Sequence, residues 1–367
     1  MYATAENRVN KLKMRPIADH HTTFVISAPH ILSCSWQRPT ERVPNRFRIT
    51  IHRTAEEITR LKPVWDKLRL AHPSTIFQDF DWNMLAARSF TETEAPFVVY
   101  AESEQGAAIV PAVIRHSDSS LRLLGEEMFD YRAFLHSGDE ETLCAALASL
   151  AETGCAMEVV AMRECDCVPG LADFSRSRFS AAPWLDSSKI SGEQFSHVHT
   201  RLARNLRRLE RLGFALKTYD GNQSQVLRLI YESKALQDEN SLFRNPERLE
   251  FVINLAKLRP EETEIFLLAS GSRLAAALVT FRDGSVRRFY TNWFDSEFRK
   301  HSPGMVLIYE VTRLSLIEGL SCDYMTGEQP YKIRMARDSM RLYRLAATSA
   351  QLAHFAEPQA TAVHPAA

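Results

Sequence analysis

The sequence lacks the features that most readily place a protein at a membrane or on nucleic acid. No stretch approaches the roughly 18 uninterrupted apolar residues that a membrane-spanning helix requires, and the first residues hold no continuous apolar segment typical of a secretory signal. We therefore expect a cytoplasmic protein without membrane insertion. Lysine plus arginine (45) equals aspartate plus glutamate (45), so no net charge favours nucleic acid or an anionic membrane as the main partner.

Cysteine and histidine patterns are equally uninformative. The six cysteines do not have the spacing of a disulfide framework. Cys165 and Cys167 are too close together for the usual Cys-x-x-Cys zinc knuckle, and no His/Cys pair lies nearby to complete four ligands. The 12 histidines are scattered. We expect reduced, mostly buried thiols and no metal site, and no Ser/His/Asp or Cys/His catalytic arrangement stands out.

What is present is the composition of an ordinary globular protein, 45% apolar and 25% charged over 367 residues, a length sufficient for two domains. Residues 1–45 lack sustained periodicity and are predicted to be a disordered arm, and the Ala/Pro-rich residues 350–367 a flexible tail. Between them, strand and helix patterns alternate, and the second half loosely repeats the first. We predict an α/β fold of two related lobes, 46–190 and 191–349, each a mixed twisted sheet flanked by helices.

Local signals support this division. Thr54 and Glu57 have the spacing of a capping box at the start of a helix. The segments PFVVYAE and GAAIVPAVIR form a predicted hairpin around Glu104–Gly106. A second hairpin, RLAAALVTFRDGSVRRFYTNW, is expected to turn at Asp283-Gly284.

The most informative stretch is Val286–Lys332, which is typical of a strand, a polar loop, a helix, a strand and a polar turn. A helix between parallel strands exposes its N-terminus at one sheet edge, where free N–H groups and the helix dipole attract anions. Ser302 and the proline after it are favoured at a helix start, and Gly304 permits close approach to the backbone. We expect an anion site at Ser302, Gly304 and Met305, assisted by Arg299. The alternative is an ordinary capped helix.

The polar turn that follows the last strand of this stretch is a candidate for catalysis. Acyl transfer to an amine or hydroxyl needs a base near the nucleophile and donors for the developing oxyanion. Asp323 or Glu328 could be the base, and Tyr331 or Lys332 the donor or acid. The alternative is a strand end followed by a solvated turn.

Two further features have competing interpretations. The predicted helix His199–Gly213 carries leucines on one face and five arginines, which favours docking by the leucines with a solvated basic face; binding of RNA or of an anionic saccharide is the alternative. These arginines are Arg201, Arg204, Arg207, Arg208 and Arg211. The segment Gly125–Tyr131 follows another strand, so Asp130 and Tyr131 are either substrate contacts or parts of a surface turn.

Taken together, Tyr290, FDSEFRKHSPGMVLIYEV, Cys322-Asp323-Tyr324 and Gly327-Glu328-Gln329-Pro330-Tyr331-Lys332 resemble the bacterial GNAT-type acyltransferase family called CelD or BcsL-like. That family is associated with cellulose and exopolysaccharide biosynthesis and is related to the FemABX peptidyltransferases, which have two GNAT lobes. The resemblance is strongest over residues 200–345. In place of the Arg/Gln-x-x-Gly-x-Gly/Ala cofactor loop of ordinary GNAT enzymes, this chain has Arg299-Lys300-His301-Ser302-Pro303-Gly304.

The resemblance implies two GNAT-like lobes, with an N- or O-acyltransferase in the C-terminal lobe and acetyl-CoA or another acyl-CoA as co-substrate. The acceptor would be a saccharide or envelope precursor, bound near Asp130, Tyr131 and Tyr290, and the protein would associate with the polysaccharide synthesis machinery. Two alternatives remain. One is FemABX-like transfer from aminoacyl-tRNA through the arginine-rich helix, and the other is a non-catalytic partner of a polysaccharide synthase.

Overall fold

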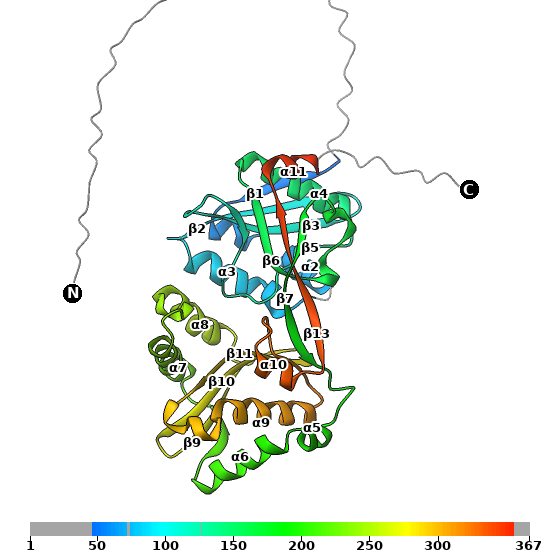
Figure 1. Cartoon of the computed structure of the whole chain (residues 1–367). Coiled ribbons are helices and arrows are strands. Elements are labelled where there is room, and N and C mark those ends of the chain that lie inside the picture. The colour runs from blue at the N-terminus through cyan, green and yellow to red at the C-terminus, as the bar shows by residue number, and fades with distance from the viewer. Residues whose placement is uncertain (1–45, 72–73, 126, 356–367) are drawn as a thin grey trace, which may run out of the picture. The chain divides into compact units, whose positions relative to one another are not determined.

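The computed structural model describes residues 46–71, 74–125 and 127–355, so the predicted arm at 1–45 lies outside the described residues. In the described part of the chain, one 13-stranded mixed sheet has the order β1-β2-β3-β4-β6-β13-β7-β12-β11-β10-β9-β8, with β5 paired to β3. Figure 1 shows helices packed along this sheet. The strands are β1 (Arg48–His52), β2 (Glu94–Glu102), β3 (Ala107–Arg115), β4 (Leu121–Leu123), β5 (Leu135–His136), β6 (Met157–Arg163), β7 (Ser175–Leu185), β8 (Ala215–Thr218), β9 (Thr263–Ser270), β10 (Arg273–Asp283), β11 (Val286–Phe294), β12 (Ser321–Asp323) and β13 (Asp338–Ala347).

The helices follow the same two-part order. They are α1 (Ala55–Thr59), α2 (Lys62–Ala71), α3 (Phe80–Ser89), α4 (Glu140–Ser149), α5 (Gly192–Val198), α6 (Thr200–Arg211), α7 (Gln223–Gln237), α8 (Pro246–Leu258), α9 (Pro303–Ile317), α10 (Pro330–Met335) and α11 (Ser349–His354). Short 3-10 turns lie between them, among them η6 (Ser296–His301) before α9. In the described residues no helix is both long and apolar enough to cross a membrane.

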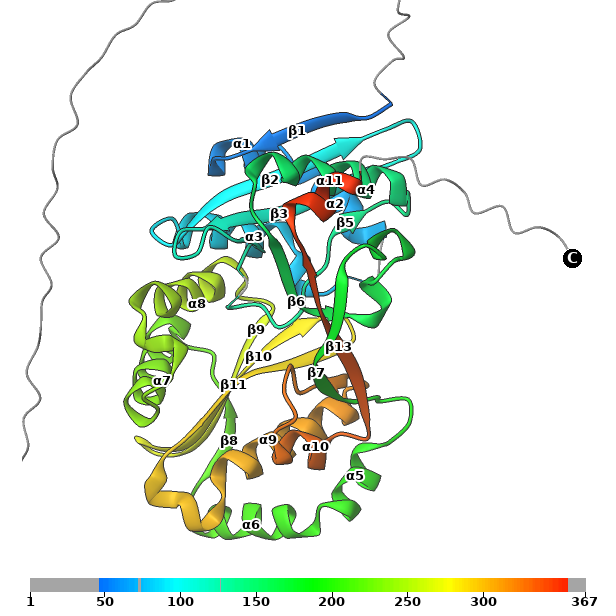
Figure 2. The same ribbon diagram turned by 45° about the horizontal axis from the view of Figure 1, so that its top comes forward.

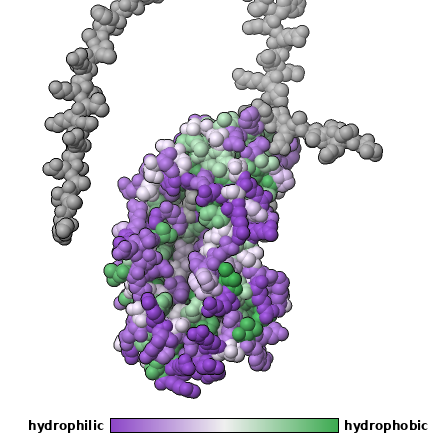
Figure 3. All heavy atoms as spheres, in the orientation of Figure 1, coloured by the Kyte–Doolittle hydropathy of each residue, from purple (hydrophilic) through white to green (hydrophobic). Residues whose placement is uncertain are grey.

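Alternating side chains on the strands explain why helices cover both faces of the sheet. On β10, Ala277 and Val279 belong to an apolar cluster with α7 and α8, whereas Ala276 and Leu278 belong to a cluster with α9. Successive strand residues point to opposite faces, so a strand buried on both sides is apolar throughout. Figure 2 shows α7 and α8 on one side of β9–β11 and α9 on the other. The face of the molecule drawn in Figure 3 is mostly hydrophilic, with hydrophobic residues in small groups.

Both predicted hairpins are present. β2 pairs with β3 from Glu102↔Ala107 onward, and β10 pairs with β11 from Asp283↔Val286, where Gly284 has a φ of +59°. The capping box at Thr54 and Glu57 also forms at the start of α1. These local features were encoded in short stretches of sequence, so they could be predicted without the rest of the chain.

The two halves of the chain exchange strands in the middle of the sheet. β13, the last strand, lies between β6 and β7, and β7 in turn pairs with β12. The β13–β7 pairing is long, running from Asp338↔Trp184 to Ala346↔Ser175. The predicted division of the lobes at residues 190/191 stays a prediction, but the sheet itself is continuous across it.

The first residues of the predicted tail at 350–367 form a helix. Thr348 and Gln351 form a capping box for α11, and Leu352 is buried beside the helices of the first half. Residues 350–355 are therefore part of the fold, and the remainder of the predicted tail lies outside the described residues.

Candidate functional site

The strands β11 and β12 separate from each other within the sheet. These parallel strands pair at only three positions, the last being Arg288↔Asp323. Beyond it, the chain after β12 stays hydrogen-bonded to β7, through Tyr324 N to Pro183 O (3.1 Å) and Gly327 N to Ala181 O (2.9 Å). β11 meanwhile continues along β10 to Phe294. Among the described residues, no strand therefore pairs with this edge of β11 after Arg288.

A β-bulge on β11 marks the place where this edge begins. Val279 faces Thr291 and Thr280 faces Phe289, so Tyr290 is the extra residue. A bulge bends its strand and redirects side chains. The hydroxyl of Tyr290 donates to the Met128 carbonyl (2.9 Å), which ties the bulge to the segment that precedes Asp130.

Beyond the bulge, β11 directs alternate backbone groups toward the unpaired edge. Asp295 N donates to Ala275 O (3.0 Å), so odd-numbered residues face β10. Asn292 and Phe294 consequently point their N–H and C=O groups away from β10. These are groups that an extended ligand with amide bonds could pair with, as an added strand does.

Two side chains of α7 border that edge. Lys234 Nζ donates to Asn292 O (3.4 Å), and Gln237 Nε2 donates to Phe294 O (3.3 Å). Burial lowers the pKa of Lys234, and Asp238 opposes this effect. Lys234 was not among the predicted site residues, because nothing in the sequence of α7 shows that this lysine faces β11.

The start of α9 follows β11 and differs in detail from the expectation. Ser302 occupies the N-cap position, but with a left-handed backbone (φ 53°) and without a side-chain capping hydrogen bond. Its N–H donates to Arg299 O (3.0 Å), so this group is not available to an anion. The N–H groups of Gly304 and Met305 lie in the first turn, where a helix makes no internal bonds. Arg299 is exposed just before the helix.

Gly304 is required by a protein contact rather than by an open approach. A Cβ at this position would lie 2.9 Å from Asn292 Nδ2 and 3.2 Å from the ring of Phe294. Asn292 therefore lies directly between β11 and the start of α9. Its Oδ1 is buried and has no hydrogen-bond partner in the described structure.

Asp323 is the centre of a buried network. Its side chain is fully buried and forms an ion pair with Arg288. One oxygen accepts from the Tyr131 hydroxyl (2.7 Å) and from Met325 N (2.8 Å). Arg288 also pairs with Asp283 (2.6 Å). The network joins β11, β12 and the Tyr131 segment and fixes Met325 in a left-handed conformation (φ 66°).

A second cluster forms around Asp130. Thr326 N donates to Asp130 Oδ1 (3.0 Å), and the Lys332 ammonium donates to the carbonyl of Thr326 (2.6 Å). Burial raises the pKa of Asp130, while Lys332 opposes this effect. Burial lowers the pKa of Lys332, and Asp130 and then Asp323 oppose it. The structure thus brings together an acid and a base from opposite halves of the chain.

The remaining predicted residues divide between this cluster and the surface. Burial raises the pKa of Tyr290 well above its usual value and also raises that of Tyr331, and Asp130 adds to both shifts. Both phenols therefore lie near Asp130. Glu328 is exposed and pairs with Arg178 (2.9 Å). The sequence placed Glu328 and Lys332 in one turn, but the fold directs them to different environments.

The arginine-rich helix α6 docks as predicted. Leu209 is buried, and Leu202 and Leu206 pack beside it against α9 and the sheet. All five predicted arginines are exposed, and within the described residues no ion pair joins them to a carboxylate. α6 contacts both α9 and η6, so this helix lies beside the candidate anion site.

Comparison with known proteins agrees with this architecture. Residues 196–333 match the model of an acetyltransferase (GNAT) domain, a match that supports an acyltransferase. A search of curated protein sequences finds no match to the chain.

Solved structures share the fold at low sequence identity. FemX is similar with a TM-score of 0.55 and 11% identity, over 81% of this chain and 96% of that one. L-PGS from Bacillus licheniformis is similar with a TM-score of 0.53 and 10% identity, over 78% of this chain and 91% of that one. A conserved protein of unknown function from Bacteroides thetaiotaomicron has a TM-score of 0.53 and 11% identity, over 82% of this chain and 99% of that one. The predicted fold class, α/β with GNAT-like lobes of mixed sheet flanked by helices, is confirmed. The narrower resemblance to the CelD or BcsL-like family stays a prediction.

Proposed function

We propose that this protein is an acyltransferase that moves an acyl group, acetyl from acetyl-CoA, to an amine or hydroxyl of a saccharide or envelope precursor. The observation that carries the proposal is the parting of β11 from β12 beside the start of α9. An unpaired strand edge suits the amides of an extended pantetheine arm, and a helix N-terminus suits a pyrophosphate. The GNAT-domain match over residues 196–333 supports the same reaction class.

The donor would lie along β11 with its pyrophosphate at α9. Gly304 and Met305 offer N–H groups, Ser302 its hydroxyl, and Arg299 a positive charge. Asn292, which lies against Gly304, would turn aside when the donor binds. This arrangement uses the predicted cofactor residues, with the Ser302 hydroxyl in place of its N–H.

In the transfer itself, the acceptor amine or hydroxyl attacks the thioester carbonyl and releases the thiol. Asp130 would take the acceptor proton, because it is the carboxylate of this cluster and burial raises its pKa above the ordinary value, which makes it a stronger base. Tyr331 would donate to the leaving sulfur, or Tyr290 once its hydroxyl releases the Met128 carbonyl, and burial favours the protonated form of both phenols. Glu328 remains the second candidate for the base.

Asp323 and Lys332 would act by positioning in this scheme. The Asp323 carboxylate is committed to Arg288 and Tyr131 and has no exposed oxygen. Lys332 binds the Thr326 carbonyl and so holds the turn that contacts Asp130. Both residues would therefore maintain the shape of the site without contacting the substrate.

Calorimetric titration with acetyl-CoA and with desulfo-CoA tests the donor half of the proposal. We expect both ligands to bind, because the pyrophosphate and pantetheine contacts do not require the sulfur. Absence of binding at millimolar concentrations of either ligand would overturn the assignment of acyl-CoA as the donor.

A second candidate is transfer from aminoacyl-tRNA, favoured by the exposed arginines of α6 beside the candidate site. Replacing Arg204, Arg207 and Arg208 by alanine should then abolish tRNA retention in a filter assay, because phosphate contacts dominate such binding. The double variant Arg48→Ala and Arg60→Ala, at exposed positions on the first half, is the matched control. Retention that survives the α6 variant, or is lost equally in the control, excludes this route.

A further inference from the structure

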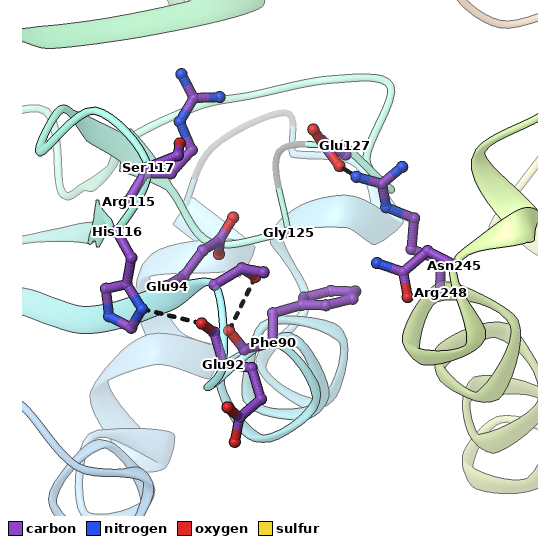
Figure 4. Close-up of a pocket in the computed structure, with 11 residues that line it drawn as sticks. Phe90, Glu92, Glu94, Arg115, His116, Ser117, Gly125, Glu127, Asn245 and Arg248 are labelled. Atoms are coloured by element: carbon purple, nitrogen blue, oxygen red, sulfur yellow. Dashed lines mark hydrogen bonds and ion pairs between the residues drawn. The ribbon is translucent and has the colours of Figure 1, made fainter. Parts of the chain in front are cut away.

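A cavity of about 450 Å³ lies between the first half of the chain and the start of α8. Figure 4 shows its walls: Phe90 and Glu94 near the α3–β2 connection, Arg115 at the end of β3, and Glu127 with Arg248 on the opposite side. We name it the Arg248 pocket. Its volume is within the ~300–1,000 Å³ usual for small-molecule sites.

The walls of the Arg248 pocket are fixed by backbone contacts. His116 N donates to Thr93 O (2.9 Å), and Glu94 N donates to Phe90 O (2.9 Å). The residues between α3 and β2 that line the pocket are therefore hydrogen-bonded to α3 and to the end of β3. Opposite, Gly125 has a φ of 67°, and a Cβ there would lie 2.6 Å from the ring of Phe129. The pocket is therefore formed before any ligand arrives, which lowers the entropic cost of binding.

The charges of the pocket select against an anion. Arg248 pairs with Glu127, and Arg115 Nε donates to Asp118 (3.1 Å), so both guanidinium groups already face a carboxylate. Burial lowers the pKa of Arg248, an effect that Glu94 opposes. Glu92 and Glu94 add two further carboxylates to the lining. The excess is acidic, which favours a neutral or amine-bearing ligand over a phosphate or carboxylate.

The same side chains suit a ligand rich in hydroxyl groups. A hydroxyl donates one hydrogen bond and accepts others, so it can contact a glutamate and an arginine together. Phe90 adds an apolar surface to this polar lining. A neutral lipid or a flat aromatic compound would cover these charged groups and exclude water from them without offering hydrogen bonds in return, which is unfavourable.

The pocket is connected to the candidate site by one short segment. Glu127 lines the pocket, Met128 O accepts from Tyr290, and Asp130 lies three residues from Glu127. Three residues span at most about 10 Å. The segment that forms part of the pocket wall therefore also carries Asp130, at a backbone distance of at most about 10 Å.

We propose that the Arg248 pocket binds a neutral or amine-bearing saccharide unit, namely the part of the acceptor that does not react. Its role as an acceptor subsite rests on the proposed function, whereas binding of the saccharide does not.

Titration followed by ligand-observed NMR, with glucosamine, cellobiose and glucose 6-phosphate as probes, tests this proposal. We expect glucosamine and cellobiose to bind and glucose 6-phosphate to bind at least fivefold more weakly. Glu94→Gln should weaken the binding of glucosamine at least fivefold. Glu127→Gln removes a negative charge, so it should reduce the difference in affinity between glucosamine and glucose 6-phosphate. Glu104→Gln, in the exposed β2–β3 turn, is the control and should change neither.

Tighter binding of glucose 6-phosphate, binding of none of the probes, or binding indifferent to both pocket variants would overturn the proposal. Thermal melting of each variant identifies loss of fold, and Glu127→Gln serves as the second test because Glu127 is half-exposed. Acetyl-CoA titration of the wild type and of the same variants separates the proposed donor from the proposed saccharide site. If the wild-type protein does not bind acetyl-CoA, the proposed donor is wrong, and saccharide binding in the pocket is judged from the NMR titrations alone.

Discussion

The chain contains two β-α-β units that differ most at the start of their helices. The first unit is β4-α4-β6 and the second is β11-α9-β12, each with its strands parallel. At α4, Asp139 caps the helix and Glu140 and Glu141 occupy the first turn. At α9, no acidic residue lies in the first turn, and three basic residues precede it.

The difference shows which unit can hold an anion. The α4 N-terminus is already neutralised by carboxylates, which would also repel a phosphate. The α9 N-terminus has no side-chain cap. The first unit instead contributes its β4–α4 connection, which carries Asp130 and Tyr131 to the second unit. In the proposed function, the second unit would therefore supply the donor site, and the first unit would supply part of the acceptor site.

The largest effect on this comparison is expected at Asp323, which joins the two units. Asp323→Ala leaves Arg288 without one of its two carboxylates and Tyr131 without its acceptor. Because loss of one member of a buried ion pair costs ~3–5 kcal/mol, we expect the free energy of unfolding to fall by about 3 kcal/mol in urea denaturation. Tyr131→Phe removes only one hydrogen bond and should cost ~1 kcal/mol. Equal losses of unfolding free energy in the two variants would show that the Asp323 carboxylate contributes no more than its hydrogen bond to Tyr131.

Gly304→Ala tests the close packing of β11 on α9. The added Cβ meets Asn292 and Phe294 at the distances given above, so overpacking of ~1–3 kcal/mol outweighs the ~1 kcal/mol gained in helix propensity. The double variant with Asn292→Ala should recover most of the loss in a double-mutant cycle. Independent, additive effects would show that the two residues are not in contact.

Ser302→Asp places a negative charge at the start of α9, as Asp139 does at the start of α4. Aspartate tolerates the left-handed backbone and favours a helix start, so the protein should remain folded while its affinity for acetyl-CoA falls about tenfold, equivalent to ~1.4 kcal/mol. Ser302→Asn is the neutral control. Glu141→Gln, at the exposed start of α4, should leave the affinity unchanged. An unchanged affinity in Ser302→Asp would remove α9 as the anion site.

The smallest effect is expected at Lys234. Because burial lowers its pKa, the unfolded chain binds more protons than the folded protein between that lowered pKa and the ordinary 10.5. Stability therefore rises with pH through this window, and the cost of the buried ammonium is fully present below it. Lys234→Met should raise the melting temperature by a few degrees at pH 7 and by less near pH 10.5. Lys332→Met should lower it, because it removes a shorter hydrogen bond (2.6 Å, against 3.4 Å at Lys234) and the positive charge beside Asp130.

A constant gain across this pH range in Lys234→Met would show that packing, rather than charge burial, is responsible. If Lys234 also borders the bound donor, the stabilised variant should bind acetyl-CoA more weakly. That combination is the usual trade between stability and function.

Much of the local structure could be predicted from the sequence. The hairpin at Asp283-Gly284, the capping box at Thr54 and the docking of α6 by Leu209 depend on residues close together in the chain. The strand exchange of β7 and β13 was not predicted, because no local pattern decides which strands pair and pairing depends on the whole sheet.

The candidate site divides in the same way. The sequence indicated Asp130, Tyr331 and Lys332 as polar residues that follow buried strands, and the family resemblance indicated Tyr290. In the structure Asp130 contributes to the pKa shifts of the other three, and their role in a site stays a prediction. The sequence did not indicate Lys234 or Asn292. Their positions follow from the packing of α7 and α9 on β11, which no short-range pattern records.

By itself, the sequence determined the α/β class, the helix start at Ser302 and the identity of the polar residues that follow β12. Tertiary structure decided what each of these groups can do. Asp323 is buried against Arg288 and holds the two units together, whereas Asp130 meets Lys332 from the other half of the chain. The physical reason is that a carboxylate's chemistry depends on its burial and on nearby charges, and both are set by residues distant in sequence.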